Sequence, residues 1–186
     1  MEGEQENLGR RIVIAPASSE DTKDIQDVFY KTWLDTYPNA EAGITVDDIE
    51  DRYKDAFTED TLRKRAERIS NPPEGEILLV AKENDRTIGL CRVVISDTEN
   101  RIQAIYVLPE YQGKGIGRKL WEEARKLFDP EKNIHVAVAT YNTNAIEFYR
   151  RLGFEDTGKR WTDEKLKMKS GSVIPEMEMI INAKEE

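Results

Sequence analysis

The stretch IYVLPEYQGKGIGR, residues 105–118, decides the fold, because it joins a strand to a helix through a glycine-rich turn. Its first residues continue an apolar strand, which Pro109 ends, and Gly113, Gly115 and Gly117 follow at alternate positions. Glycine lets the main chain approach a ligand closely and point successive N–H groups into one concave surface. The N-terminus of the following helix adds partial positive charge, so the turn is suited to an anion.

The basic residues Lys114, Arg118 and Lys119 add full positive charges, and together with the turn they make an anion site suited to a pyrophosphate. A Walker A loop needs G-x-x-x-x-G-K-[ST], which the turn lacks. A dinucleotide fingerprint needs G-x-G-x-x-G inside an early parallel βαβ unit, whereas this turn reads G-x-G-x-G after antiparallel strands. Both nucleotide interpretations are therefore weak, and a flexible turn without a ligand is the remaining alternative.

The hydrophobic pattern on either side of the turn predicts the other elements. Apolar runs and alternation predict strands at residues 11–16, 76–82, 87–96, 101–107 and 133–139. Apolar residues at helical spacing predict helices after Ser18, Thr45 and Thr58, and over residues 116–128 and 145–152. Residues 154–161 and 173–181 are expected to form a closing antiparallel pair.

This order of elements predicts an α+β fold with a mixed, mostly antiparallel sheet of about seven strands and flanking helices. Residues 76–107 should form an antiparallel meander, and residues 101–139 a central βαβ crossover of the right-handed kind. We expect one domain over residues 10–182, with flexible tails at 1–9 and 183–186.

The composition fits a single globular domain with its own core, since the chain has 186 residues, of which 38% are hydrophobic. No apolar run approaches the roughly 20 residues of a membrane span, and residues 1–10 lack the apolar segment of a secretory signal. We therefore expect a cytoplasmic protein without a membrane partner. The net charge of −9 opposes binding to nucleic acid and mildly favours a cationic acceptor such as an amine.

Two segments together resemble the GNAT superfamily of N-acetyltransferases. Residues 105–118 closely resemble its acetyl-CoA motif, usually written Q/R-x-x-G-x-G/A. Residues 142–154, NTNAIEFYRRLGF, are similar to the family's N-x-x-A…Y…GF segment, and the two segments occur in the family's order. The resemblance covers about residues 76–181, whereas residues 18–70 match only by position, because acceptor-binding regions vary within the family.

The resemblance implies that acetyl-CoA is the cosubstrate and that strands 101–107 and 133–139 splay apart around its pantetheine arm. It assigns the arm to the main chain of Ile105 and Val107, and the pyrophosphate to the N–H groups of the turn. The coenzyme-binding residues that it implies are Ile105, Val107, Gln112, Gly113, Lys114, Gly115, Ile116, Gly117, Arg118 and Asn142.

Tyr149 stands where the family usually places its general acid, which protonates the departing thiolate. The chemistry supports this assignment, because a phenol with a pKa of about 10 suits a thiolate whose conjugate acid has a pKa of about 8.5. The alternative is that Tyr149 is a core aromatic residue beside Phe148.

The general base is not assigned, because Arg101 and Ala137 stand where many relatives carry a glutamate. Glu99, Glu110 and a water chain remain open. His135 is expected to be partly exposed and inert rather than a base, and without partner ligands it predicts no metal site. Cys91 is expected to be a buried structural thiol, which favours direct transfer in a ternary complex over a covalent acetyl-enzyme.

The acceptor pocket is expected between the first helices and the closing hairpin, with Trp33, Asp35, Tyr37 and Trp161 as candidate lining residues. Core packing is the favoured interpretation of Trp33, which lies on an apolar helical stripe. The sequence thus predicts an N-acetyltransferase for the primary amine of a small molecule, polyamine or peptide. A non-catalytic acyl-CoA sensor and a nucleotide-binding protein are the alternatives, and a homodimer is left open.

Overall fold

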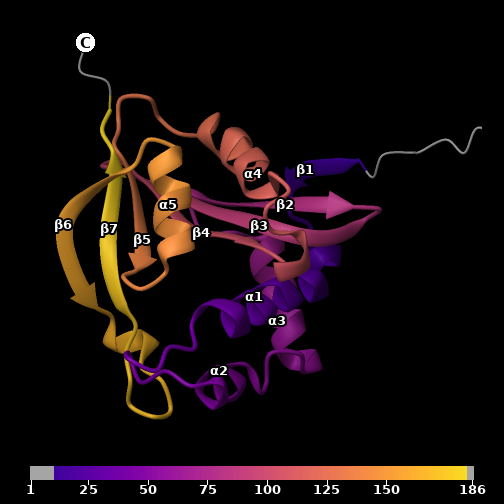
Figure 1. Cartoon of the computed structure of the whole chain (residues 1–186). Coiled ribbons are helices and arrows are strands. Elements are labelled where there is room, and N and C mark those ends of the chain that lie inside the picture. The colour runs from indigo at the N-terminus through magenta and orange to yellow at the C-terminus, as the bar shows by residue number, and fades with distance from the viewer. Residues whose placement is uncertain (1–10, 184–186) are drawn as a thin grey trace, which may run out of the picture.

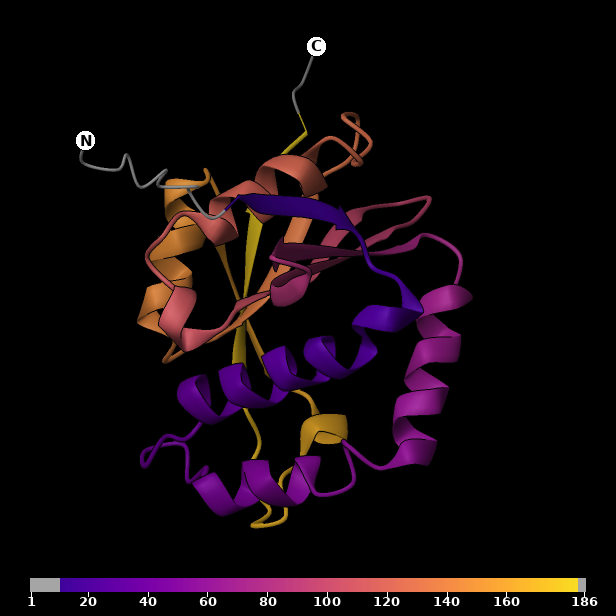
Figure 2. The same ribbon diagram turned by 90° about the vertical axis from the view of Figure 1, so that its right-hand side faces the viewer.

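The computed structural model describes residues 11–183, and these form one seven-stranded sheet with helices on both faces (Figures 1 and 2). The strands are β1 (Ile12–Pro16), β2 (Glu76–Glu83), β3 (Arg86–Ile95), β4 (Asn100–Val107), β5 (Ile134–Ala139), β6 (Glu155–Thr162) and β7 (Pro175–Ile181). The helices are α1 (Thr22–Thr36), α2 (Val46–Tyr53), α3 (Glu59–Ser70), α4 (Ile116–Arg125) and α5 (Thr143–Arg151). The predicted tails, 1–9 and 183–186, lie outside the described residues except for Ala183.

The strand order β1-β2-β3-β4-β5-β7-β6 confirms the predicted fold class. Neighbouring strands from β1 to β4 pair antiparallel, as do β5 with β7 and β7 with β6. The parallel pair is β4 with β5, and α4 lies between them in the chain, as the predicted crossover requires. None of the helices in residues 11–183 is long and apolar enough to cross a bilayer.

Pairing between β4 and β5 is confined to the first residues of both strands, from Asn100↔Ile134 to Ile102↔Val136. The side chain of Asn100, fully buried, holds this end together. Its Nδ2 donates to the carbonyls of Asp129 and Lys132 at 2.8 and 3.1 Å, and its Oδ1 accepts from the N–H of Asp129 at 3.1 Å. Beyond Ile102 the two strands separate, which opens the centre of the sheet.

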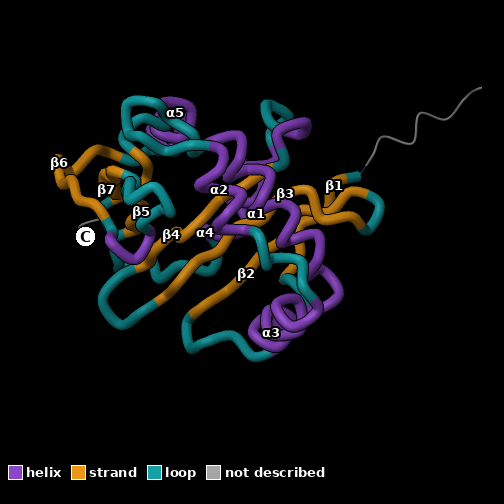
Figure 3. The backbone as a smooth tube through the Cα atoms, turned by 90° about the horizontal axis from the view of Figure 1, so that it is seen from below, coloured by secondary structure: helices purple, strands orange, loops and turns teal. Residues whose placement is uncertain are grey.

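Helices α4 and α5 cover one face of the sheet, and α1 to α3 lie on the other (Figures 1 and 2). Seen from the side of α1 to α3, the helices cross in front of the strands (Figure 3). Apolar side chains of α1 and α4, such as Val28 and Leu120, are buried in the main core. The helix predicted to reach residue 128 ends at Arg125, because Lys126 and Leu127 bond three residues back and Pro130 then stops the helix.

A second, smaller core joins the helices α1 and α2 to the segment that precedes β7. It contains Trp33 from α1, Ile49 from α2 and Ile174 from the segment before β7. Asp48 fixes this contact, because its carboxylate accepts from the N–H and the hydroxyl of Ser170 at 2.8 and 2.9 Å. Hydrogen bonding, first from the main chain of Thr45 and then from Ser170, lowers the pKa of Asp48 to about 2.

Candidate active site

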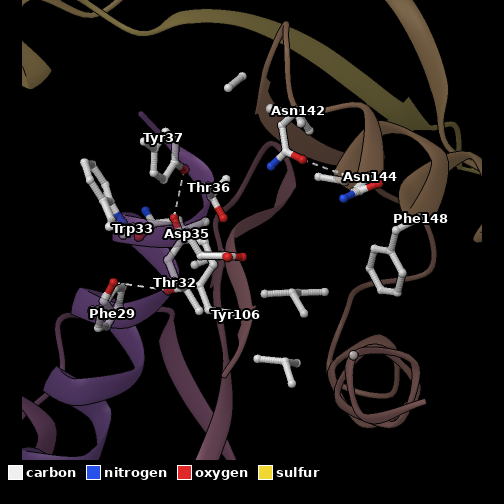
Figure 4. A pocket seen from close by; sticks show the side chains of 18 of the residues that line it. Phe29, Thr32, Trp33, Asp35, Thr36, Tyr37, Tyr106, Asn142, Asn144 and Phe148 are labelled. Atoms are coloured by element: carbon white, nitrogen blue, oxygen red, sulfur yellow. Dashed lines mark hydrogen bonds between the residues drawn. The ribbon is translucent and has the colours of Figure 1, made fainter. Parts of the chain in front are cut away.

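A cavity of about 1490 Å³ lies where β4 and β5 separate. One side of it is formed by α1, α2 and α3, and the other by the glycine-rich turn and α5. Figure 4 shows Asn142, Asn144 and Phe148 on one side of the cavity, with Thr36 and Tyr37 on the other. The fold therefore places the two sequence segments that carry the family resemblance at a single site.

The turn before α4 leaves its main chain accessible. Gly113 and Gly115 have φ values of +72° and +78°, in the left-handed region that favours glycine. A Cβ atom added at either residue would meet no atom within 4 Å, so the space that a side chain would fill is open. At Gly117 an added Cβ would lie 3.4 Å from the Phe148 ring, so this glycine permits close packing of α4 against α5.

The N–H groups of this turn supply the donors that an anion needs. Within residues 11–183, none of the N–H groups of residues 113–118 donates a hydrogen bond to the protein. The first such bond in α4 runs from the N–H of Lys119 to the carbonyl of Gly115 at 3.1 Å. Unpaired donors at a helix N-terminus form an anion-binding site, so the residues present fit a pyrophosphate.

The polar side chains of the turn contact the protein itself in this structure. Gln112 Nε2 donates to the carbonyl of Val107 at 3.1 Å, and Lys114 Nζ donates to the carbonyl of Glu110 at 2.8 Å. Arg118 forms an exposed ion pair with Glu122 at 2.9 Å. The groups of the turn that are left to contact a ligand are therefore mainly its main-chain N–H groups. The hydrogen bonds of Gln112 and Lys114 stabilise the turn.

Tyr149 lines the cavity from α5, and its side chain is only 5% exposed. Its ring packs edge-on against Phe148 and Phe154, with centroids 5.2 and 5.3 Å away. Burial raises the pKa of its hydroxyl well above the ordinary value, and the neighbouring Cys91 thiol adds to the shift. The phenol is therefore neutral at any pH at which the protein would be assayed.

Asn142 caps α5, because its Oδ1 accepts from the N–H of Ala145 at 3.0 Å. This contact fixes the side chain at the cavity wall, where Figure 4 shows it opposite Tyr37. The Asn142 side chain, which is predicted to contact the coenzyme, thus also has a structural role as the N-cap of α5.

The residues considered as bases or nucleophiles in the sequence do not line the cavity. Cys91 is completely buried on β3, and burial raises its pKa to about 12, which confirms the predicted structural thiol. His135 is 16% exposed and lies between Glu99 and Glu178, with nitrogen–oxygen distances of 3.7 and 3.4 Å. Glu99 is held by Arg101 at 2.7 Å, outside the cavity lining.

Glu176 is a cavity-lining carboxylate that the sequence did not single out. It lies on β7, opposite Ala139 of β5 and Trp161 of β6. Burial raises its pKa; a hydrogen bond from the Trp161 indole opposes the shift, and the charge of Asp163 adds to it. In the sequence, Glu176 and Glu178 alternate with buried methionines, which indicates a polar strand face but does not say which glutamate reaches a ligand.

Aromatic side chains from three segments surround the cavity near Glu176. The hydroxyls of Tyr37 and Tyr106 lie 3.1 Å apart, and the Tyr141 hydroxyl donates to the Tyr37 carbonyl at 3.0 Å. Trp33 packs on Tyr37 with ring centroids 4.3 Å apart and is only 8% exposed, which confirms its core position. Trp161 does not line the cavity, so the expectation that it does is wrong; it lies behind Glu176 instead.

Comparisons with known proteins agree with this arrangement. Residues 74–156 match the family described as "Acetyltransferase (GNAT) domain". Peptidyl-lysine N-acetyltransferase YjaB of Salmonella typhimurium is 28% identical over 92 residues, which are 50% of this chain and 59% of that protein. An uncharacterized N-acetyltransferase of Chlorobaculum tepidum, CT2212, is 31% identical over 88 residues, 47% of this chain and 55% of that protein.

The chain thus spans little more than half the length of the curated relatives that it matches. Among solved structures, the PaiA N-acetyltransferase of Thermoplasma acidophilum, determined in complex with coenzyme A, superimposes with a TM-score of 0.65 at 22% identity. That match covers 89% of this chain and 98% of the other, which shows that the fold is shared along nearly its whole length.

Proposed function

We propose that this chain is an acetyl-CoA-dependent N-acetyltransferase of the GNAT superfamily that transfers the acetyl group directly to an amine in a ternary complex. The observation that carries this proposal is the row of N–H groups at residues 113–118 that donate to no other described residue, beside the gap between β4 and β5. Acetyl-CoA supplies the activated acetyl group. The N–H groups would hold its pyrophosphate, and the open edge of β4, at Ile105 and Val107, its pantetheine arm.

Tyr149 is the proposed general acid. Tyr149 lines the cavity, and its hydroxyl keeps its proton because burial raises its pKa. A proton held there is available to the thiolate that forms when the thioester bond breaks. Because its pKa is raised, the Tyr149 phenol still carries its proton when negative charge develops on the thiolate sulfur.

Glu176 is the proposed acceptor of the proton that the amine loses when its nitrogen attacks. Its carboxylate lines the same cavity, beside the hydroxyls of Tyr37 and Tyr106, whose pKa values it helps to raise. The raised pKa of Glu176 brings this base closer to neutral pH, where proton transfer is most effective.

Direct transfer is supported by Cys91, the chain's single cysteine. The thiol is completely buried and its pKa is about 12, so it forms almost no thiolate near neutral pH. The name of the Salmonella relative, a peptidyl-lysine N-acetyltransferase, supports an amine as the acceptor.

The proposal is tested by following thiol release from acetyl-CoA with a panel of spermidine, cadaverine, L-lysine and a lysine-containing peptide. Turnover of at least one amine is expected, together with acetyl-CoA binding in calorimetry. Coenzyme binding without turnover of any amine would instead identify an acyl-CoA sensor. Tighter binding of ATP than of acetyl-CoA would identify a nucleotide-binding protein.

A further inference from the structure

Three arginines from three separate elements line one wall of the cavity. They are Arg52 in α2, Arg65 in α3 and Arg92 in β3, and all three lie on the side formed by α1 to α3. The chain as a whole carries a net charge of −9, so a concentration of positive charge inside its main cavity is a local property of the fold. The glycine-rich turn belongs to the other side of the cavity.

The three arginines line the same cavity, and electrostatic effects link them in pairs: Arg52 and Arg65 act on Tyr53, and Arg92 acts on Arg65. The charges of Arg52 and Arg65 both act on the Tyr53 hydroxyl, whose pKa is raised chiefly by burial. Burial lowers the pKa of Arg65, and the neighbouring charge of Arg92 acts in the same direction. The Arg52 guanidinium lies 4.9 Å from the centre of the Trp33 ring, which fixes it beside the aromatic wall.

The protein itself supplies little negative charge to balance this cluster. Within residues 11–183, Arg52 and Arg65 form no ion pair, and Asp55, on the same wall, pairs with neither. Arg92 pairs with Glu76 at 2.9 Å, but Glu76 is shared with Arg68 at 2.7 Å. The Nε of Arg92 is buried and has no hydrogen-bond partner among the described residues. Arg52 and Arg65 are exposed to solvent on the cavity wall, so their guanidinium groups are available to an anion that enters the cavity.

Glu176 carries a negative charge and lines the same cavity as the three arginines. The Tyr37 and Tyr106 hydroxyls, 3.1 Å apart, line it too; the Glu176 charge acts on both phenols, and the Arg52 charge acts on Tyr106. A ligand in this cavity can therefore be offered both a carboxylate and guanidinium groups.

We propose that Arg52, Arg65 and Arg92 form a subsite for an oxyanion on the acceptor, so that the acceptor is an amine that also carries a carboxylate or a phosphate. This inference rests on the proposed acetyl transfer. The planar guanidinium group suits both oxyanions, since it can donate two parallel hydrogen bonds to either. The acceptor's amine is then directed toward Glu176, and a purely cationic polyamine is disfavoured despite the acidity of the chain.

The test compares amines that differ only in the oxyanion. L-Lysine is compared with cadaverine, which lacks the carboxylate, and O-phosphoethanolamine with ethanolamine, which lacks the phosphate. In thiol-release assays, kcat/KM for the oxyanion-bearing member of at least one pair should exceed that of its partner by about tenfold or more. The pair that shows the larger ratio identifies the oxyanion. Equal rates within both pairs, or faster transfer to cadaverine and ethanolamine, would overturn the subsite.

Arg65→Gln should reduce the ratio of kcat/KM between the oxyanion-bearing amine and its partner to about one. The substitution removes a cavity-lining guanidinium charge that has no ion-pair partner among residues 11–183. Arg63→Gln is the matched control, since Arg63 lies on the same helix, pairs with Asp60 and Glu67, and does not line the cavity. The ratio should survive Arg63→Gln. A ratio that persists in Arg65→Gln, with acetyl-CoA affinity confirming an intact fold, contradicts the assignment.

A binding arm separates failure of this inference from failure of the proposed function. The coenzyme-A-loaded protein is titrated in a calorimeter with both members of each pair. If no amine is acetylated but an oxyanion-bearing amine binds more tightly than its partner, and Arg65→Gln removes that difference, the subsite stands and the transferase proposal fails. If neither oxyanion strengthens binding, the subsite is wrong, whatever the turnover.

Discussion

The coenzyme side and the acceptor side of the cavity are built in different ways. The coenzyme side comes from one stretch of chain, from β4 through the glycine-rich turn and α4 to α5. The acceptor side combines α1, α2 and α3 with β7, so that Asp48 contacts Ser170 across 122 positions of sequence. On the first side the proposed binding groups belong to the main chain, whereas on the second they belong to side chains. Binding by the main chain leaves a local sequence pattern, and binding by assembled side chains does not.

The largest expected effect concerns Tyr149, the coenzyme-side residue that acts through its side chain. Tyr149→Phe should lower kcat by about 300-fold, because it removes the proton donor and little of the packing. Acetyl-CoA affinity should stay close to that of the wild type in calorimetry. Tyr141 also lines the cavity, so a greater loss in Tyr141→Phe would move the acid role there and break the assignment.

Glu176 tests whether an acceptor-side side chain does chemistry. Glu176→Gln should lower kcat/KM by about 100-fold near neutral pH, less than the loss at Tyr149 because a neutral amine needs no base. The raised pKa of Glu176 means that its base form is lost on acidification at a higher pH than for an ordinary glutamate. The wild-type rate should therefore fall on the acid side through that pKa.

The Glu176→Gln variant should lose this acid limb in the pH profile of kcat/KM. Glu178→Gln is the control, since Glu178 is on the same strand but contacts His135 and Lys159 outside the cavity lining. An acid limb that persists in Glu176→Gln and disappears in Glu178→Gln would transfer the role to the other carboxylate.

Asp48 tests the long-range assembly of the acceptor side. Asp48→Asn should lower the free energy of unfolding by about 2 kcal/mol at neutral pH, because it weakens charged hydrogen bonds to Thr45 and Ser170. The folded-state pKa of about 2 lies below the unfolded value of about 3.9. The stabilisation is thus present above pH 4 and lost as the pH falls from about 4 to about 2.

Urea unfolding of the wild type and Asp48→Asn at several pH values checks this prediction. The difference in unfolding free energy between the two proteins should shrink over that pH range. A difference that does not depend on pH would show that the Asp48 carboxylate is not the source of the stability.

The smallest expected effect concerns the main chain of the coenzyme side. Gly115→Asp should weaken acetyl-CoA binding by about tenfold, because it adds a negative side chain where the structure leaves open space and strains a φ of +78°. Gly158→Asp is the matched control, since Gly158 has a φ of +81°, equally open surroundings and no place in the cavity lining. Equal affinity of both variants in calorimetry would remove the turn from the binding site.

The sequence predicted the fold and located the glycine-rich turn, because both depend on short-range patterns. Alternating apolar residues fixed the strands, and the spacing of Gly113, Gly115 and Gly117 marked the turn whose open main chain the structure shows. The acid role of Tyr149 and the coenzyme contacts of Gln112 and Asn142 stay predictions.

Only the tertiary structure decided which polar side chains meet at the acceptor. Glu176 and Glu178 have the same alternation in the sequence, yet only Glu176 lines the cavity, whereas Glu178 contacts His135 and Lys159. Arg52, Arg65 and Arg92 belong to three elements and come to line one cavity only when α2 and α3 pack beside the sheet. Net charge is a sum over the chain and so predicted a cationic acceptor, whereas binding depends on the few charges that the fold brings within reach of the ligand.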